Sequence, residues 1–369
     1  MPPGEPFVIQ VPDAVLDDLR ARLRRTRWPK PSPEPSWEQG VELEYLHDLL
    51  DYWADGFDWR AQEERLNAFA HFRARVDGVD IHYVHERARG GHGIPLILTH
   101  GWPSSFVEHL QIAPLLADSF DVVIPSLPGY GFSKRPARAT TRDTARLWHA
   151  LMRGLGYEHY AAQGGDFGAS VTTYMALDDP APLLAIHLHQ IDDTPYTGPG
   201  SRPLSDAERE YREKVAHWDA TERGYSAIQS TKPQTVAYAL NDSPAGLAAW
   251  IVEKWRSWSG SLERIDRDVL LTNLTIYWAT QTIGGSMRDY YDERWHGSTI
   301  GPDDFVAVPT AVALFANEHV SEGTPPREWA ERLYDIRRWT VMPRGGHFAP
   351  AEEPEALARD IEAFFRDLL

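Results

Sequence analysis

Residues 164 to 168 carry the clearest chemical signal in the sequence. They read Gly-Gly-Asp-Phe-Gly, which has the Gly-x-nucleophile-x-Gly spacing of a nucleophile elbow, a sharp turn between a strand and a helix. Asp166 stands where serine is usual. A carboxylate that attacks an sp³ carbon forms an ester that water can cleave, whereas a serine would form a stable ether. The pattern therefore predicts a substrate with an electrophilic alkyl carbon, such as an epoxide or an alkyl halide. By itself, the segment fits an ordinary turn with Asp166 as a helix cap equally well.

A histidine and an acid are candidates to complete a catalytic triad with Asp166. His347 follows the last expected strand and two glycines. The order nucleophile, acid, histidine is that of an α/β-hydrolase. Glu318 follows the preceding apolar strand, where the acid that orients the histidine belongs, and Glu322 and Asp335 are alternatives nearby.

The loop His100-Gly101-Trp102-Pro103 follows the first buried strand. In an α/β-hydrolase this loop supplies one donor of the oxyanion hole, and the residue after the nucleophile supplies the other. The backbone N–H groups of Trp102 and Phe167 are therefore the expected donors. We expect His100 itself to have a structural role.

Short apolar segments separated by helical ones must position these residues. Buried strands are expected at residues 94–101, 121–125, 157–163, 306–315 and 337–343. Such a pattern predicts an α/β fold, a mostly parallel sheet covered by helices on both faces. Ligands bind at the carboxyl ends of strands in such a sheet. The elbow and the His100 loop both lie there.

The remaining segments suggest four parts. Residues 1–75 hold helical stretches and a proline-rich linker, and we interpret them as an N-terminal extension that wraps the core. Residues 76–193 and 297–369 form the two parts of the α/β core. Residues 194–296 are helical and rich in aromatic side chains, which indicates an inserted cap.

Composition excludes several other classes of protein. The chain has 369 residues, 42% hydrophobic and 25% charged, as is usual for a globular protein. Its net charge of −17 argues against nucleic acid or an anionic membrane as partner and suits a cytoplasmic protein. With no cysteine, the chain has no disulfides and no thiol chemistry. We expect neither a signal sequence nor a membrane anchor.

Motifs along nearly the whole chain are similar to those of the microsomal-type epoxide hydrolases, which carry an extra N-terminal segment on an α/β-hydrolase fold. The matching pieces lie at residues 6–29, 100–103, 127–133, 164–168, 229–233, 240–247 and 344–349. The segment from Gln229 to Leu247 is the most specific of these, because a general α/β-hydrolase has no reason to carry it.

The resemblance implies further site residues. Two cap tyrosines donate to the epoxide oxygen in this family, and Tyr225 and Tyr290 match them, with Tyr291 adjacent to the second. A neutral phenol suits this task because it stabilises a developing alkoxide without adding charge. The family acid matches Glu318, although alanine replaces the usual proline two residues before it.

The resemblance implies a two-step reaction that needs no metal and no organic cofactor. Asp166 would form an ester with an apolar epoxide, and His347 would activate the water that releases a vicinal diol. The alternatives are a haloalkane or haloacid dehalogenase, with the same nucleophile and base, and a non-catalytic ligand-binding protein on the same fold. A homodimer is the expected assembly.

Overall fold

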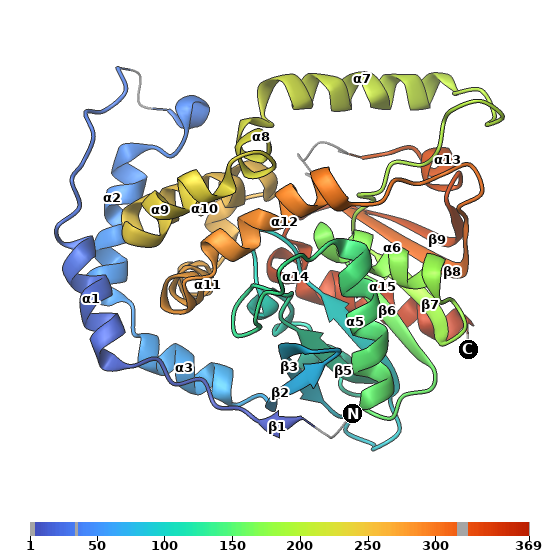
Figure 1. Ribbon diagram of the computed structural model, residues 1–369, viewed down its shortest axis with the longest axis horizontal. Helices are drawn as coiled ribbons and strands as arrows, with labels where there is room; N and C mark the ends of the chain where they lie inside the picture. The colour runs from blue at the N-terminus through green and yellow to red at the C-terminus, as the bar shows by residue number, and fades with distance from the viewer. Residues whose placement is uncertain (1–3, 34–35, 316–323, 369) are drawn as a thin grey trace.

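The computed structural model describes residues 4–33, 36–315 and 324–368. In this described part, a nine-stranded sheet with the order β1-β2-β3-β5-β4-β6-β7-β8-β9 lies at the centre (Figure 1). Its strands are β1 (Glu5–Pro6), β2 (His71–Val76), β3 (Val79–Glu86), β4 (Ile94–Thr99), β5 (Phe120–Pro125), β6 (Tyr160–Gly164), β7 (Leu183–Leu188), β8 (Val306–Phe315) and β9 (Tyr334–Met342). Strands β4 to β9 run parallel, and β1 to β3 form an antiparallel edge.

The strand sequences explain this arrangement. Leu96, Ile97 and Leu98 of β4 are fully buried, as expected for a parallel strand covered on both faces. Strands β2 and β3 pair as an antiparallel hairpin. Asp77 and Gly78 at its tip both have positive φ, 44° and 86°, which matches the twist that two-residue hairpin turns require.

Helices cover both faces of the sheet. Helix α5 packs against α6, and α4 packs against α15. The helices of the core are η3 (Phe106–His109), α4 (Ala113–Leu116), α5 (Thr141–Gly154), α6 (Phe167–Asp178), α13 (Arg327–Ala330), α14 (Ala349–Glu352) and α15 (Pro354–Leu368). This is the α/β-hydrolase fold that the sequence predicted.

The N-terminal segment runs along one side of the molecule and reaches both the sheet and the cap (Figure 1). It contains α1 (Asp13–Leu23), η1 (Trp37–Gln39), α2 (Leu43–Asp51), η2 (Tyr52–Gly56) and α3 (Trp59–Asn67). In α1, Leu16, Leu19 and Leu23 form the buried face. Strand β2 crosses the expected boundary at residue 75, so we propose that the extension ends near residue 70.

The cap consists of helices inserted between β7 and β8. They are α7 (Asp206–Thr221), α8 (Gly224–Gln229), α9 (Pro233–Asp242), α10 (Pro244–Trp258), η4 (Leu262–Arg264), α11 (Arg267–Thr280) and α12 (Ile283–His296). Helices α8, α9 and α12 contact one another. The division of the chain into extension, core and cap remains our proposal. Among the described helices, none combines the length and apolar character needed to cross a bilayer.

The register of the central strands brings the predicted site together. Thr99 at the end of β4 lies beside Gly164 at the end of β6. The loop after β4 and the elbow after β6 therefore leave the sheet side by side, at the edge where ligands bind in such folds.

Candidate active site

The elbow holds Asp166 in a conformation that few residues adopt. The backbone of Asp166 has φ 52° and ψ −134°, in the positive-φ region that strains a residue with a side chain. On either side of Asp166, a side chain at the position of the glycine would not fit. A Cβ on Gly164 would overlap the backbone of Gly168, and a Cβ on Gly168 would overlap the carbonyl of Thr99. The tight turn therefore fixes the nucleophile candidate at the tip of β6.

Two backbone donors hold one oxygen of the Asp166 carboxylate. The Trp102 N–H donates to Oδ1 of Asp166 over 2.9 Å, and the Phe167 N–H donates to the same oxygen over 2.7 Å. These are the two donors that the sequence predicted for an oxyanion hole. The Asp166 N–H donates in turn to Oε1 of Gln190 over 3.0 Å, which ties the elbow to the loop after β7.

Burial and hydrogen bonding act on the charge of Asp166 in opposite directions. Burial raises the pKa of Asp166, and repulsion from Asp192 adds to this effect. The imidazole of His347 and the two backbone N–H groups lower the pKa. The donors therefore favour the ionised carboxylate that nucleophilic attack requires.

His347 lies on the other side of the carboxylate. Its Nε2 is 3.5 Å from Oδ2 of Asp166, and the side chain is 4% exposed. The His347 backbone N–H donates to the carbonyl of Trp258 over 2.9 Å. Glu352 accepts hydrogen bonds of 3.1 Å from the N–H groups of Gly346 and Phe348. Contacts on both sides of the histidine thus fix the loop that aims its ring at Asp166.

Of the three candidates for the acid that orients His347, the structure describes only Asp335. Glu318 and its alternative Glu322 lie outside the described residues. Asp335 lies near the start of β9, and its carboxylate accepts a 2.9 Å hydrogen bond from Arg337. Because β9 runs parallel to β8, its start lies at the end of the strands opposite the elbow. Asp335 is therefore too far from the site to orient His347.

The two tyrosines named from the resemblance come together beside the oxyanion donors. The rings of Tyr225 in α8 and Tyr290 in α12 are 5.7 Å apart. Tyr225 stacks on the Trp102 ring at 5.3 Å, and Tyr290 meets the same ring edge-on at 5.6 Å. Burial raises the pKa of Tyr290 well above its usual range, so its phenol stays protonated. Tyr291 packs instead on Trp295 and is 36% exposed.

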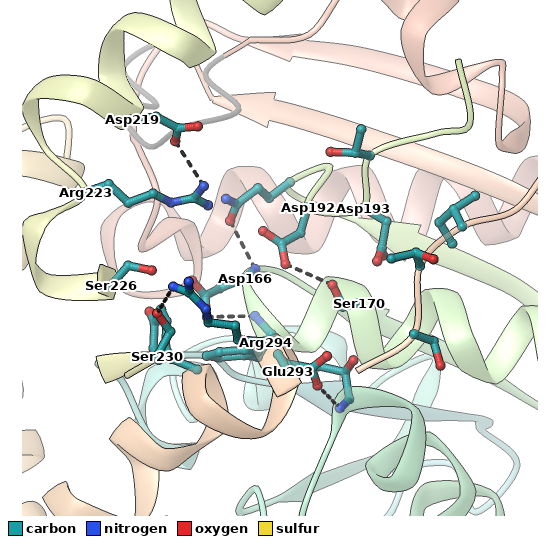
Figure 2. Close-up of a pocket in the computed structure, with 18 of the residues that line it drawn as sticks. Asp166, Ser170, Asp192, Asp193, Asp219, Arg223, Ser226, Ser230, Glu293 and Arg294 are labelled. Carbon is teal, nitrogen blue, oxygen red and sulfur yellow. Dashed lines mark hydrogen bonds and ion pairs between the residues drawn. The ribbon is translucent and has the colours of Figure 1, made fainter. Parts of the chain in front are cut away.

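A cavity of about 1020 Å³ connects these groups with the surface. Asp166, Phe167, Tyr225 and Tyr290 line its inner end. Elsewhere the wall carries charged side chains, several of which Figure 2 shows around Asp166: Asp192, Asp193, Asp219, Arg223, Glu293 and Arg294. Burial raises the pKa values of Asp193 and Glu293 to about 7. The wall is thus more polar than the aromatic composition of the cap suggested.

Sequence reasoning missed several residues around the site. Gln190, Asp192 and Asp193 follow β7, a strand that the sequence pattern did not reveal. Lys254 of α10 places its Nζ 4.6 Å from the centre of the Tyr225 ring. A short apolar run at Leu183–Leu188 followed by polar residues was the available signal for the first three. The sequence gives no local signal for Lys254, because only the fold of the cap brings it under Tyr225.

His100 behaves as expected for a structural residue. Its Nε2 accepts a 3.1 Å hydrogen bond from the Leu127 N–H, and its Nδ1 lies 3.2 Å from the Gly101 carbonyl. Burial lowers the pKa of His100 to about 4, so the ring is neutral at pH 7. It braces the loop that presents the Trp102 N–H.

Comparison with known proteins places this geometry in a family. Residues 4–109 match the family described as epoxide hydrolase N terminus, and residues 94–201 match the alpha/beta hydrolase fold. A putative epoxide hydrolase from Stigmatella aurantiaca is 39% identical over 98% of this chain and 85% of the relative. The chain belongs to the epoxide hydrolase family. Epoxide hydrolase 1 of Oryctolagus cuniculus is 38% identical over 97% of this chain and 88% of its own length.

Solved structures of epoxide hydrolases share the whole architecture. The Aspergillus niger epoxide hydrolase superposes with a TM-score of 0.86 at 30% identity, covering 99% of this chain and 97% of the other. The juvenile hormone epoxide hydrolase of Bombyx mori gives a TM-score of 0.88 at 29% identity, covering 99% and 94%. The match spans the N-terminal segment, core and cap together.

Proposed function

We propose that this protein converts an epoxide and water into a vicinal diol through a covalent ester on Asp166. The setting of the Asp166 carboxylate carries the proposal. One oxygen accepts hydrogen bonds from the Trp102 and Phe167 N–H groups, and the other faces His347. A carboxylate held in this way, beside two phenols at the inner end of a cavity, suits attack on an epoxide carbon.

In the first step, Oδ2 of Asp166 attacks one ring carbon while the bond from that carbon to the ring oxygen breaks. Tyr225 and Tyr290 donate to the ring oxygen, and one of them gives it a proton. The product is a hydroxyalkyl ester of Asp166. The close approach of both rings to Trp102 supports this role, since it holds the phenols in fixed positions.

In the second step, water attacks Cγ of the ester rather than the substrate carbon. His347 takes a proton from that water, and the Trp102 and Phe167 N–H groups stabilise the oxyanion on Oδ1. When the oxyanion collapses, the bond between Cγ and Oδ2 breaks, and the departing diol takes the proton from His347. The carboxylic acid left on Asp166 then gives up its proton, and the tyrosinate formed in the first step regains one, so that the cycle closes. We propose Glu318 as the acid that orients His347, on the strength of its position after β8.

The walls of the cavity support a substrate with an apolar group next to the epoxide ring. Phe167, Tyr225 and Tyr290 surround the inner end, where such a group would lie. The charged residues farther out would meet a polar substituent or water.

Replacing the nucleophile tests the proposal directly. Asp166→Asn removes the charged oxygen that attacks, so we expect diol formation to fall by roughly 10³-fold or more. The assay uses styrene-like, aliphatic and cyclic epoxides and measures diol by chromatography, while mass spectrometry checks that the amide persists. Asp118→Asn is the matched control, because Asp118 is 69% exposed and pairs with Arg89 at the surface.

Three results would contradict the proposal. Wild-type diol formation by Asp166→Asn would remove the aspartate from the mechanism. Halide release from haloalkanes without diol formation from any epoxide would favour a dehalogenase, and tight epoxide binding without turnover would favour a binding protein.

Two accompanying proposals concern the setting of the enzyme. Its net charge of −17 suits a cytoplasmic location. A homodimer is our proposed assembly, because two-fold dimers are the commonest oligomers and the cap exposes the apolar side chains of Ile228, Tyr238 and Trp295, which a second copy would cover.

A further inference from the structure

A second, much smaller cavity lies beside Asp166, which also lines the large cavity. Its volume is about 10 Å³, which is room for about one water molecule. Its lining comes mostly from the loops after β4, β6, β7 and β9: His100, Gly101, Trp102, Ser104, Glu108, Gly165, Asp166, His189, His347 and Phe348. The nucleophile and the base of the proposed reaction therefore share this small cavity.

Glu108 contributes a carboxyl group to the same cavity. It lies in the short 3-10 helix η3, whose residues are all buried, and is itself 5% exposed. Among the described residues, no arginine or lysine lies within ion-pair distance of its carboxyl group. Burial raises the pKa of Glu108 to about 7, with further increases from Asp166 and Glu352, whereas the Ser104 hydroxyl and His347 lower it. Glu108 is thus electrostatically coupled to both reacting residues.

A purely structural role does not explain why a carboxyl group is buried at position 108. Burying a carboxyl group without a cationic partner costs free energy that an apolar or amide side chain of similar size would avoid. Buried ionisable groups with shifted pKa values cluster at functional sites. Glu108 shares with Asp166 and His347 a cavity that fits about one water molecule, and this shared site indicates a chemical role.

We propose that Glu108 positions the water molecule that hydrolyses the ester on Asp166. This inference rests on the proposed function. The water occupies the small cavity, donates one hydrogen bond to the Glu108 carboxyl group and directs its oxygen at Cγ of Asp166. Its other hydrogen points to Nε2 of His347.

Residues already named accept every proton and electron pair that moves in this step. A water O–H bond breaks as His347 takes the proton, and the water oxygen bonds to Cγ of Asp166. The electrons of the carbonyl bond move to Oδ1, between the Trp102 and Phe167 N–H groups. Glu108 gains and loses no proton. Its negative charge, when ionised, stabilises the imidazolium that forms on His347. Glu108 is therefore a positioning residue for the second step and has no part in the first.

The test separates the two steps in the variant Glu108→Gln. Under single-turnover conditions with a styrene-like epoxide, rapid quenching and peptide mass spectrometry follow the ester on Asp166. We expect the ester to form at the wild-type rate and to decay roughly 10- to 100-fold more slowly. In steady state, kcat and KM should fall by the same factor, leaving kcat/KM unchanged. A structural defect would lower kcat/KM without accumulating ester.

The matched control is Glu63→Gln, the same substitution at another buried glutamate. Glu63 is 8% exposed and accepts a hydrogen bond from the Val11 N–H in the N-terminal segment, far along the chain from the site. Both steps should keep their wild-type rates in this variant. If Glu108→Gln does not fold, Glu108→Asp retracts the carboxyl group by one methylene and should slow ester decay alone.

The inference is overturned if the ester decays at the wild-type rate in a folded Glu108 variant. It is also overturned if both steps slow equally. An absence of ester in the wild-type protein as well as in the variants would instead contradict the proposed function, so the two failures are distinguishable.

Discussion

At the scale of single residues, two adjacent tyrosines have different surroundings. Successive residues of a helix point about 100° apart. Tyr290 therefore meets Trp102 and Phe167 at the inner end of the cavity, whereas Tyr291 packs on Trp295 toward the surface. The resemblance left open which of them donates to the epoxide oxygen. Their surroundings favour Tyr290.

Tyr290→Phe should slow formation of the ester on Asp166 by roughly 100-fold, because it removes one donor to the developing alkoxide. Stopped-flow measurement of the single-turnover rate checks this. Tyr291→Phe is the matched control, with the same loss of a hydroxyl one residue away, and should keep the wild-type rate. The reverse order of effects would assign the role to Tyr291.

Some residues of the site could be predicted from the sequence, and others could not. The elbow and the loop after β4 bring Asp166, Trp102 and Phe167 together, and sequence reasoning could name these residues because glycine spacing and strand order are local signals. Glu108 and Gln190 were not predicted. Each gains its importance from contacts across the sheet edge with residues distant in sequence, and a buried glutamate or glutamine has no local pattern that distinguishes it from a surface one.

At the scale of elements, helix α7 is anchored at one end. Glu208 is fully buried there and completes a capping box with Ser205. Its carboxylate also accepts hydrogen bonds from Arg332, at 2.6 and 2.8 Å, and from Arg202 at 2.9 Å. The far end of α7 contributes Asp219 to the wall of the large cavity. The anchor therefore holds an element that shapes the substrate site.

Glu208→Gln should lower the free energy of unfolding at pH 7 by roughly 3 kcal/mol, because it leaves Arg332 buried without its counter-charge. Hydrogen bonds to the arginines and to Ser205 lower the folded-state pKa of Glu208 to about 2 despite the opposing effect of burial. An unfolded glutamate titrates near about 4.3. The stabilisation is therefore complete above about pH 4.3 and is lost as the pH falls toward 2.

Urea denaturation at pH 7 and at decreasing pH measures this effect. The difference between wild type and Glu208→Gln should shrink as the pH falls through this window. Glu210→Gln is the control on the same helix, since Glu210 is 67% exposed and pairs with Lys214, and it should change stability by less than about 1 kcal/mol. Equal losses in both variants would contradict the anchor.

At the scale of the whole molecule, the N-terminal segment joins the sheet to the cap. Strand β1 pairs with β2 in the sheet. Trp53 donates from its indole N–H to the Thr275 hydroxyl over 3.0 Å, and Gln62 donates to Asp268 over 2.9 Å. Both partners lie in α11 of the cap. The segment thus contributes to holding the tyrosines of the cap above the elbow of the core.

The fold as a whole was predictable because most buried strands are continuous apolar runs. Strand β7 escaped because a six-residue apolar run fits a strand or a buried helix segment equally well, and His187 interrupts it. The structure resolves this point: the His187 ring lies 3.1 Å from the Asp360 carboxylate of α15. Because this pair joins residues far apart in the chain, no local sequence pattern predicts it. The polar wall of the large cavity was not predicted either, because its residues also come from segments far apart in the chain.

The central claim is that an oxygen of Asp166 leaves in the diol during every cycle. A single turnover, with enzyme in excess over epoxide in water labelled with heavy oxygen, tests it most directly. Mass spectrometry of the digested protein and of the diol follows the label. We predict that the label enters the peptide containing Asp166 and that the first diol released carries none. Label that passes straight into the diol, with none in that peptide, would contradict the account.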